Sequence, residues 1–176
     1  YGMLPPRTAP IDIIGPVGTQ ALIDHLAAAH GPWVTDPGYP VRVTELTPGA
    51  SVDLGGAKLE CAKVPQTPES MAYSVTEGGR RLVYSGDTGY DVAFAEWARG
   101  CDLLLLECSL PQSMAIAEHL TPEQCGELAR LAAPRRLVLT HFYPPVESVD
   151  FSAIVGARYD GPLVVAHDGW RTDFGD

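Results

Sequence analysis

The chain has 176 residues and a formal net charge of −10, from 12 Lys+Arg against 22 Asp+Glu. This length suits one domain with its own core, and we predict a single domain over 1–176. A protein this acidic is poorly suited to charge-driven binding, so neither nucleic acid nor a membrane is expected as a partner. The four cysteines form no CxxC pair, which is typical of idle thiols in a reducing compartment and predicts a cytoplasmic protein.

The N-terminal half is predicted to consist mainly of short strands. Ile11–Ile14 is a β-branched run closed by Gly15-Pro16, a pattern typical of a strand that ends in a turn. Thr19 stands where it can cap a helix over residues 20–30. The apolar face of this helix is predicted to comprise Ala21, Leu22 and Leu26. Further strands are predicted at residues 41–46, 51–54 and 58–64.

The C-terminal half is predicted to alternate strands with helices. A hairpin is expected from residues 71–76 and 81–85, joined by a Gly78-Gly79 turn, and a short helix over residues 92–98. The apolar run Leu103–Leu106 predicts a strand covered on both faces. Thr121 is predicted to cap the next helix. Buried strands follow at 137–140 and 163–166. This order predicts an α/β fold with helices packed outside the sheets.

Polar side chains follow several of the predicted strands at the point where each strand ends. Asp87, His141 and His167-Asp168 occupy such positions, and His119 precedes the helix opened by Thr121. Strand ends of this kind are where α/β sheets build functional sites. Carboxylate and imidazole together form a ligand set that suits zinc, manganese or iron. Taken singly, an aspartate after a strand is more typical of a turn residue than of a ligand, and a lone histidine there is more typical of a hydrogen-bonded structural residue.

An ordered series of short segments resembles a known family. It comprises Arg81–Thr88 (RLVYSGDT), Cys101–Cys108 (CDLLLLEC), His119–Glu123 (HLTPE), Arg136–Phe142 (RLVLTHF) and Ala166–Gly169 (AHDG). In this order they resemble the metallo-β-lactamase fold superfamily, and most of all its ribonuclease Z-like branch. The segment Ile11–Thr19 resembles the same branch. The resemblance implies an αββα sandwich, an α/β fold that carries a metal-dependent hydrolase site.

The resemblance also implies roles for individual residues. Asp87 takes the place of an aspartate that bridges two metal ions, and His141 that of a histidine that ligates the second ion. His119 matches a catalytic histidine that donates a proton or stabilises the transition state. Glu107 matches a variable acidic position, and Asp168 is expected to be structural. The implied cofactor is zinc, or manganese or iron, with two ions in the complete domain.

Two departures from the family pattern limit this expectation. The motif His-x-His-x-Asp-His is absent, since the five histidines are His25, His30, His119, His141 and His167. We expect the motif upstream of Tyr1, so the chain would correspond to the C-terminal two-thirds of the fold, incomplete at the N-terminus. Gln66 stands where the resemblance places another metal histidine, and its amide is a weak ligand. Metal binding is therefore expected to be weak or absent in this chain alone.

Two functions of different classes remain in competition. The first is a metal-dependent hydrolase of a small ester or phosphodiester, acting through a dinuclear site. The second is a non-catalytic or metal-deficient family member that serves as a binding or scaffold domain. A third reading is an acidic α/β domain without a metal. An incomplete fold would expose a sheet edge, which predicts a homo-oligomer or completion by another chain segment.

Overall fold

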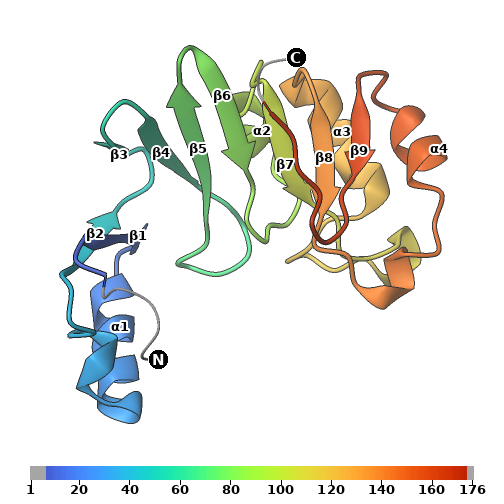
Figure 1. Cartoon of the computed structure of the whole chain (residues 1–176). Coiled ribbons are helices and arrows are strands. Elements are labelled where there is room, and N and C mark those ends of the chain that lie inside the picture. The colour runs from blue at the N-terminus through green and yellow to red at the C-terminus, as the bar shows by residue number, and fades with distance from the viewer. Residues whose placement is uncertain (1–6, 174–176) are drawn as a thin grey trace. The chain divides into compact units, whose positions relative to one another are not determined.

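The computed structural model describes residues 7–173. The chain divides into two compact units, one reaching to Thr47 and the other starting at Pro48 (Figure 1). Each unit is described by itself. In the described residues, no helix is both long and apolar enough to cross a membrane.

The first unit is a small β-α-β element. Strand β1 (Ile11–Pro16) pairs in parallel with β2 (Val41–Leu46), and helix α1 (Thr19–His30) and the 3-10 helix η1 (Pro32–Val34) lie between them in the chain. The strand predicted at residues 41–46 and the helix predicted over residues 20–30 are confirmed, whereas β1 continues through Gly15-Pro16, where a turn was predicted. Both α1 histidines are exposed.

The start of α1 differs from the prediction. Gly18 is the N-cap, and the Thr19 hydroxyl donates to the Pro16 carbonyl at 2.6 Å instead of capping the helix. The Glu45 carboxylate accepts from both Gly18 N and Gln20 N at 2.9 Å. A carboxylate from β2 therefore satisfies the first helical amides and faces the positive end of the helix dipole. The predicted apolar face of α1 is also not packed, since Leu22 is 58% exposed.

The second unit is built on a seven-stranded sheet of order β3-β4-β5-β6-β7-β8-β9. Its strands are β3 (Ser51–Asp53), β4 (Lys58–Lys63), β5 (Met71–Glu77), β6 (Arg80–Tyr84), β7 (Leu103–Glu107), β8 (Leu137–Thr140) and β9 (Leu163–Val165). Strands β3 to β6 pair antiparallel, whereas β6 to β9 pair in parallel. The predicted hairpin is confirmed, with Gly78 and Gly79 at φ 56° and 78° in the turn.

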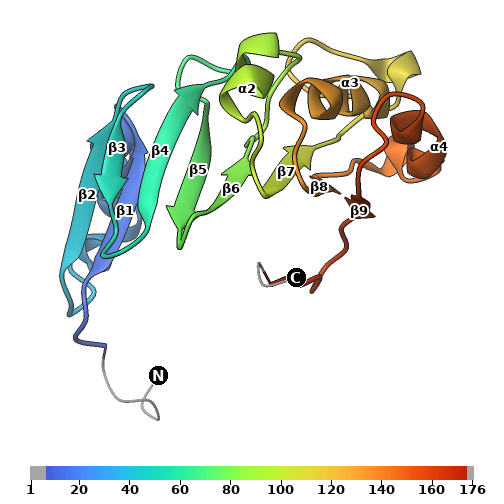
Figure 2. The same ribbon diagram turned by 90° about the horizontal axis from the view of Figure 1, so that it is seen from above.

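Three helices cover one face of this sheet (Figure 2). They are α2 (Val92–Trp97), α3 (Pro122–Ala132) and α4 (Phe151–Gly156), and two 3-10 helices, η2 (Gln112–Met114) and η3 (Pro144–Val146), lie in the connections. The predicted cap of α3 is confirmed: Thr121 Oγ1 accepts from Gln124 N, and the Gln124 side chain accepts from Thr121 N. This capping box fixes the start of the helix that follows His119.

The core lies between the sheet and these helices. Leu104 and Leu106 of β7 and Leu128 of α3 are fully buried. Leu105, on the other face of β7, is only half-buried, so the strand is not covered on both faces along its whole length as predicted. Strand β9 was expected to be buried, but it is one of the two edge strands of this sheet and Val165 is 39% exposed.

Candidate active site

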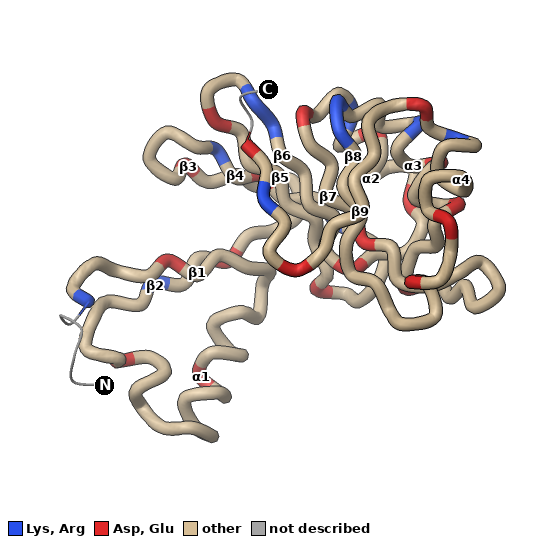
Figure 3. The backbone as a smooth tube through the Cα atoms, turned by 45° about the vertical axis from the view of Figure 1, so that its right-hand side comes forward, with Lys and Arg blue, Asp and Glu red and all other residues tan. Residues whose placement is uncertain are grey.

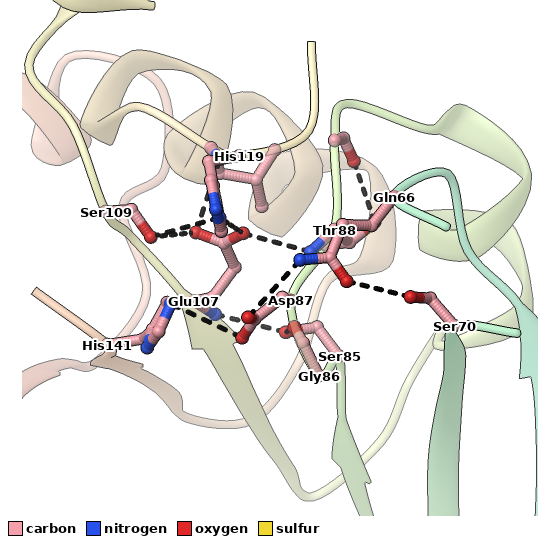
Figure 4. A network of polar contacts seen from close by, with 12 residues as sticks. Gln66, Ser70, Ser85, Gly86, Asp87, Thr88, Glu107, Ser109, His119 and His141 are labelled. Atoms are coloured by element: carbon pink, nitrogen blue, oxygen red, sulfur yellow. Dashed lines mark hydrogen bonds and ion pairs between the residues drawn. The ribbon is translucent and has the colours of Figure 1, made fainter. Parts of the chain in front are cut away.

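The carboxyl ends of β6, β7 and β8 lie at one edge of the second unit's sheet, because these strands run in parallel. Asp87 follows β6, Glu107 ends β7, and His141 follows β8. His119, from the loop before α3, completes the group (Figure 4). Sites at this edge are usual in parallel sheets. We call these four residues the carboxyl-edge cluster.

The loop that carries Asp87 is shaped by two glycines. Gly86 has φ 60°, a left-handed conformation that a side chain would strain. A Cβ on Gly89 would lie 1.9 Å from the Ala117 carbonyl oxygen, so only glycine fits there. Gly89 N also donates to the Pro65 carbonyl at 2.8 Å. The Asp87 loop is thus held between the segments that carry Gln66 and His119.

Glu107 is the hydrogen-bond centre of the cluster and is completely buried. Its Oε1 accepts from His119 Nδ1 at 2.8 Å and from Thr88 N at 2.9 Å. Its Oε2 accepts from the Ser109 hydroxyl at 2.7 Å and from Leu120 N at 3.3 Å. A buried carboxylate is tolerated only when its oxygens are satisfied in this way. The contact with Nδ1 orients the His119 ring and leaves Nε2 available to other partners.

His141 is held in a strained backbone beside Asp87. Its φ is 62°, in the left-handed region that non-glycine residues rarely adopt. Nε2 lies 3.4 Å from Asp87 Oδ1, yet this buried nitrogen makes no hydrogen bond. The ring also packs against His119 and Tyr143, with centroid separations of 5.6 and 5.3 Å. A polar atom left unpaired at such a place commonly marks a functional site.

The donor atoms of the cluster fit a metal ion. Asp87, His119 and His141 each offer one ligand atom, and these atoms lie within 4.8 Å of one another. One carboxylate and two imidazoles form a set suited to zinc and similar ions. The unpaired Nε2 of His141 is the nitrogen that such an ion would use. The residues present therefore fit one metal ion at this edge.

Gln66 lies next to the cluster but presents a donor to it. The Ser70 hydroxyl donates to Gln66 Oε1 at 2.8 Å, which occupies the amide oxygen. Gln66 Nε2 then faces Asp87 and donates to its Oδ2 at 3.4 Å. The amide thus contacts Asp87 with its nitrogen, which cannot ligate a metal ion. The sequence identified Gln66 as a weak ligand, and its orientation reduces that role further.

A cavity of about 590 Å³ opens beside His141. It is lined by Thr140, His141, Phe142, Glu147, Ala166, His167 and Asp168. Its size is in the usual range for a small-molecule site. In the described part of the chain, no hydrogen bond reaches the Asp168 carboxylate; its backbone carbonyl instead lies 3.0 Å from His167 Nδ1. The structural role expected for Asp168 is therefore not seen in its side chain.

The structure brings Asp87, His119 and His141 together. It also shows that Glu107 accepts the hydrogen bonds that organise the cluster, a role that the sequence did not indicate. Glu107 had been matched only to a variable acidic position. Its signal in the sequence is a charged residue directly after four leucines, Leu103–Leu106. Glu107 is buried at the end of this apolar strand, and a buried carboxylate needs several donors.

Comparisons with known proteins show the family. Residues 3–142 match the model of the Beta-lactamase superfamily domain, so the chain belongs to that superfamily. It is 31% identical over 164 residues to the uncharacterized protein ML1173 of Mycobacterium leprae, which covers 92% of this chain and 58% of the relative. It is 26% identical over 192 residues to a putative ribonuclease Z of Mycobacterium tuberculosis, covering 94% of this chain and 84% of that protein.

The structural comparison agrees with the family. The metallo-β-lactamase fold protein YhfI from Bacillus subtilis superposes with a TM-score of 0.75 at 20% identity, over 92% of this chain and 64% of that chain. The predicted resemblance and the mixed α/β fold are therefore confirmed. The chain spans between half and two-thirds of the length of ML1173. Whether the first metal motif lies upstream stays a prediction.

Proposed function

We propose that the protein is a metal-dependent hydrolase that acts on a small ester or phosphodiester at the carboxyl-edge cluster. The convergence of Asp87, His119 and His141 carries this proposal, because their ligand atoms lie within 4.8 Å of one another. Membership of the Beta-lactamase superfamily supports it. The cavity of about 590 Å³ beside His141 supports a small substrate.

The residues of the cluster have distinct tasks in this proposal. Asp87 and His141 would hold the metal, with the unpaired Nε2 of His141 as one ligand atom. When bound, the ion supplies an activated water and polarises the bond to be cleaved. His119, fixed through Nδ1 by Glu107, is oriented to donate a proton to the leaving group or to stabilise the developing negative charge. Glu107 is a positioning residue, since it acts through His119.

His119 also qualifies as a third metal ligand, and the two roles predict different results. If His119 is a ligand, His119→Ala weakens metal binding. If it is a proton donor, the variant keeps its metal and loses turnover. The dinuclear arrangement and the choice of zinc stay predictions, because a second ion needs more ligands than this edge presents among the described residues.

The alternative is a metal-deficient family member that binds a partner without catalysis. The orientation of Gln66 favours it, because the amide contacts Asp87 with its nitrogen. For either function, association with a second copy or with another chain segment stays a proposal, which light scattering of the purified chain would test. A monodisperse monomer would contradict it.

The decisive experiment combines metal content with hydrolysis. The chain is purified, loaded with zinc, manganese or iron, and analysed by mass spectrometry; p-nitrophenyl acetate and bis(p-nitrophenyl) phosphate serve as test substrates. We expect weak metal binding and slow hydrolysis of one substrate, both lost in Asp87→Ala and His141→Ala. The matched control is His25→Ala, an exposed histidine of α1. Absence of metal and of hydrolysis would favour the binding domain.

A further inference from the structure

We propose that a cavity at the opposite edge of the sheet binds the phosphate group of a small ligand. The cavity has a volume of about 220 Å³ and lies where β6, β7 and β8 begin. It is lined by Arg80, Asp102, Leu103, Arg135, Arg136, Pro162 and Asp173. We call it the amino-edge pocket. Its lining residue Leu103 and Glu107 lie at opposite ends of β7, four residues apart, a distance of roughly 13 Å at 3.3 Å per residue.

One carboxylate holds two of the three arginines in place. Asp102 Oδ1 accepts from Arg80 Nη1 at 3.1 Å and from Arg135 Nη1 at 3.2 Å. Its other oxygen, Oδ2, accepts from Arg81 N at 2.8 Å. Each guanidinium has five N–H donors, so these bonds fix the two arginines and leave most of their donors unused. The side chains of Arg80 and Arg135 are 40% and 63% exposed, so those donors are accessible to a ligand.

The third arginine approaches from the start of β8. Arg136 Nη1 donates to Thr172 Oγ1 at 2.7 Å, and this anchors the guanidinium without neutralising it. Three arginines face two aspartates in the pocket, which leaves one positive charge in a chain whose net charge is −10. Figure 3 shows Lys and Arg positions gathered near the starts of β6 and β8. The pocket is thus a local basic site in an acidic protein.

The chemistry of the lining selects a phosphate group. Guanidinium groups donate parallel pairs of hydrogen bonds that match phosphate and carboxylate oxygens. A dianionic phosphate satisfies more of the unused donors than a carboxylate does. The cavity of about 220 Å³ suits a single phosphate group with little attached to it. A free phosphate ion and a phosphomonoester share this chemistry, and the experiment separates them.

The test is isothermal titration of the full chain with inorganic phosphate, in EDTA and at constant ionic strength. We expect saturable binding at one site per chain. Arg135→Gln and Arg136→Gln should each weaken it at least tenfold, and Arg136→Lys should weaken it less. The matched control is Arg130→Gln, which removes the same charge from α3 outside the pocket and should change the affinity less than twofold.

Three outcomes would overturn the proposal. They are absence of saturable binding, equal weakening by Arg130→Gln, and loss of binding in His141→Ala, which would place the phosphate at the carboxyl-edge cluster. Circular dichroism verifies that each variant is folded. If Arg136→Gln does not fold, Arg135→Gln carries the test, because that side chain is the more exposed.

Titration with glycerol 3-phosphate and with glycerol identifies the source of the phosphate. Tighter binding of glycerol 3-phosphate than of phosphate, with no binding of glycerol, assigns a phosphomonoester. Equal or weaker binding of glycerol 3-phosphate assigns free phosphate.

Discussion

The two ends of the parallel strands each hold a carboxylate, and the two carboxylates differ in burial and in hydrogen-bond partners. At the carboxyl edge, Glu107 is completely buried and accepts from amides, a hydroxyl and an imidazole. At the amino edge, Asp102 is 17% exposed and pairs with two solvent-accessible arginines. Burial makes each hydrogen bond of Glu107 obligatory, whereas solvent screens the ion pairs of Asp102. The first carboxylate therefore fixes the geometry of its neighbours, and the second mainly sets local charge.

The largest effect should come from Glu107→Gln. An amide in this place would direct a donor at groups that already donate, so we expect a loss of about 3 kcal/mol in the free energy of unfolding. Urea denaturation followed by circular dichroism measures it. The control is Glu127→Gln, which removes an exposed ion pair with Arg130 on α3. It should change the free energy of unfolding far less. Equal losses would mean that burial does not make the hydrogen bonds of Glu107 stronger than an exposed ion pair.

Next in size is the effect of Gln66→His on metal binding. An imidazole would replace an amide that presents its nitrogen to Asp87, so we expect zinc to bind at least tenfold more tightly, about 1.4 kcal/mol. Competition with a chromophoric chelator measures the affinity. Gln66→Ala removes the amide without adding a ligand and should not tighten binding. If both variants behave alike, position 66 does not face the metal.

A smaller effect is expected for Asp102→Asn, and it should depend on pH. The hydrogen bond from Arg81 N, followed by those from Arg80 and Arg135, lowers the pKa of Asp102 below its ordinary value of 3.8. A lowered folded pKa stabilises the protein above the ordinary value, and this contribution is lost as the pH falls through the folded value. At neutral pH, we expect the free energy of unfolding of the wild type to be higher than that of the variant by about 1 kcal/mol. Urea denaturation across pH measures the difference; a constant gap would contradict it.

The smallest effect should be that of Arg135→Gln on stability. Its side chain is 63% exposed, and an exposed ion pair contributes about 0.5 kcal/mol. The loss should shrink further in high salt, which screens such pairs. Thermal denaturation at low and high salt measures both. A loss of about 2 kcal/mol or more would place the amino edge in the same energetic class as the carboxyl edge.

The sequence predicted local features better than distant partners. The Gly78-Gly79 turn and the cap at Thr121 were predicted correctly, because neighbouring residues determine them. The cap of α1 was not, since Glu45 lies 27 residues from Gly18 along the chain. No pattern of neighbouring residues predicts a contact between residues so far apart in the sequence.

The candidate site divides in the same way. The resemblance identified Asp87, His119 and His141, which the structure brings together. The four donors to Glu107 come from three segments of the chain and meet only on folding. The orientation of the Gln66 amide depends on the hydroxyl of Ser70. The identities of the site residues could therefore be predicted from the sequence, whereas their hydrogen-bond partners could not.

The left-handed backbone of His141, with φ 62°, sets two kinds of selection against each other. Glycine and asparagine adopt this conformation more readily than histidine, which is strained there. A library of variants selected for heat resistance alone would drift toward those residues at position 141. Selection for bound metal would keep the imidazole. The residue found at position 141 after selection would thus show whether stability or metal binding had been selected.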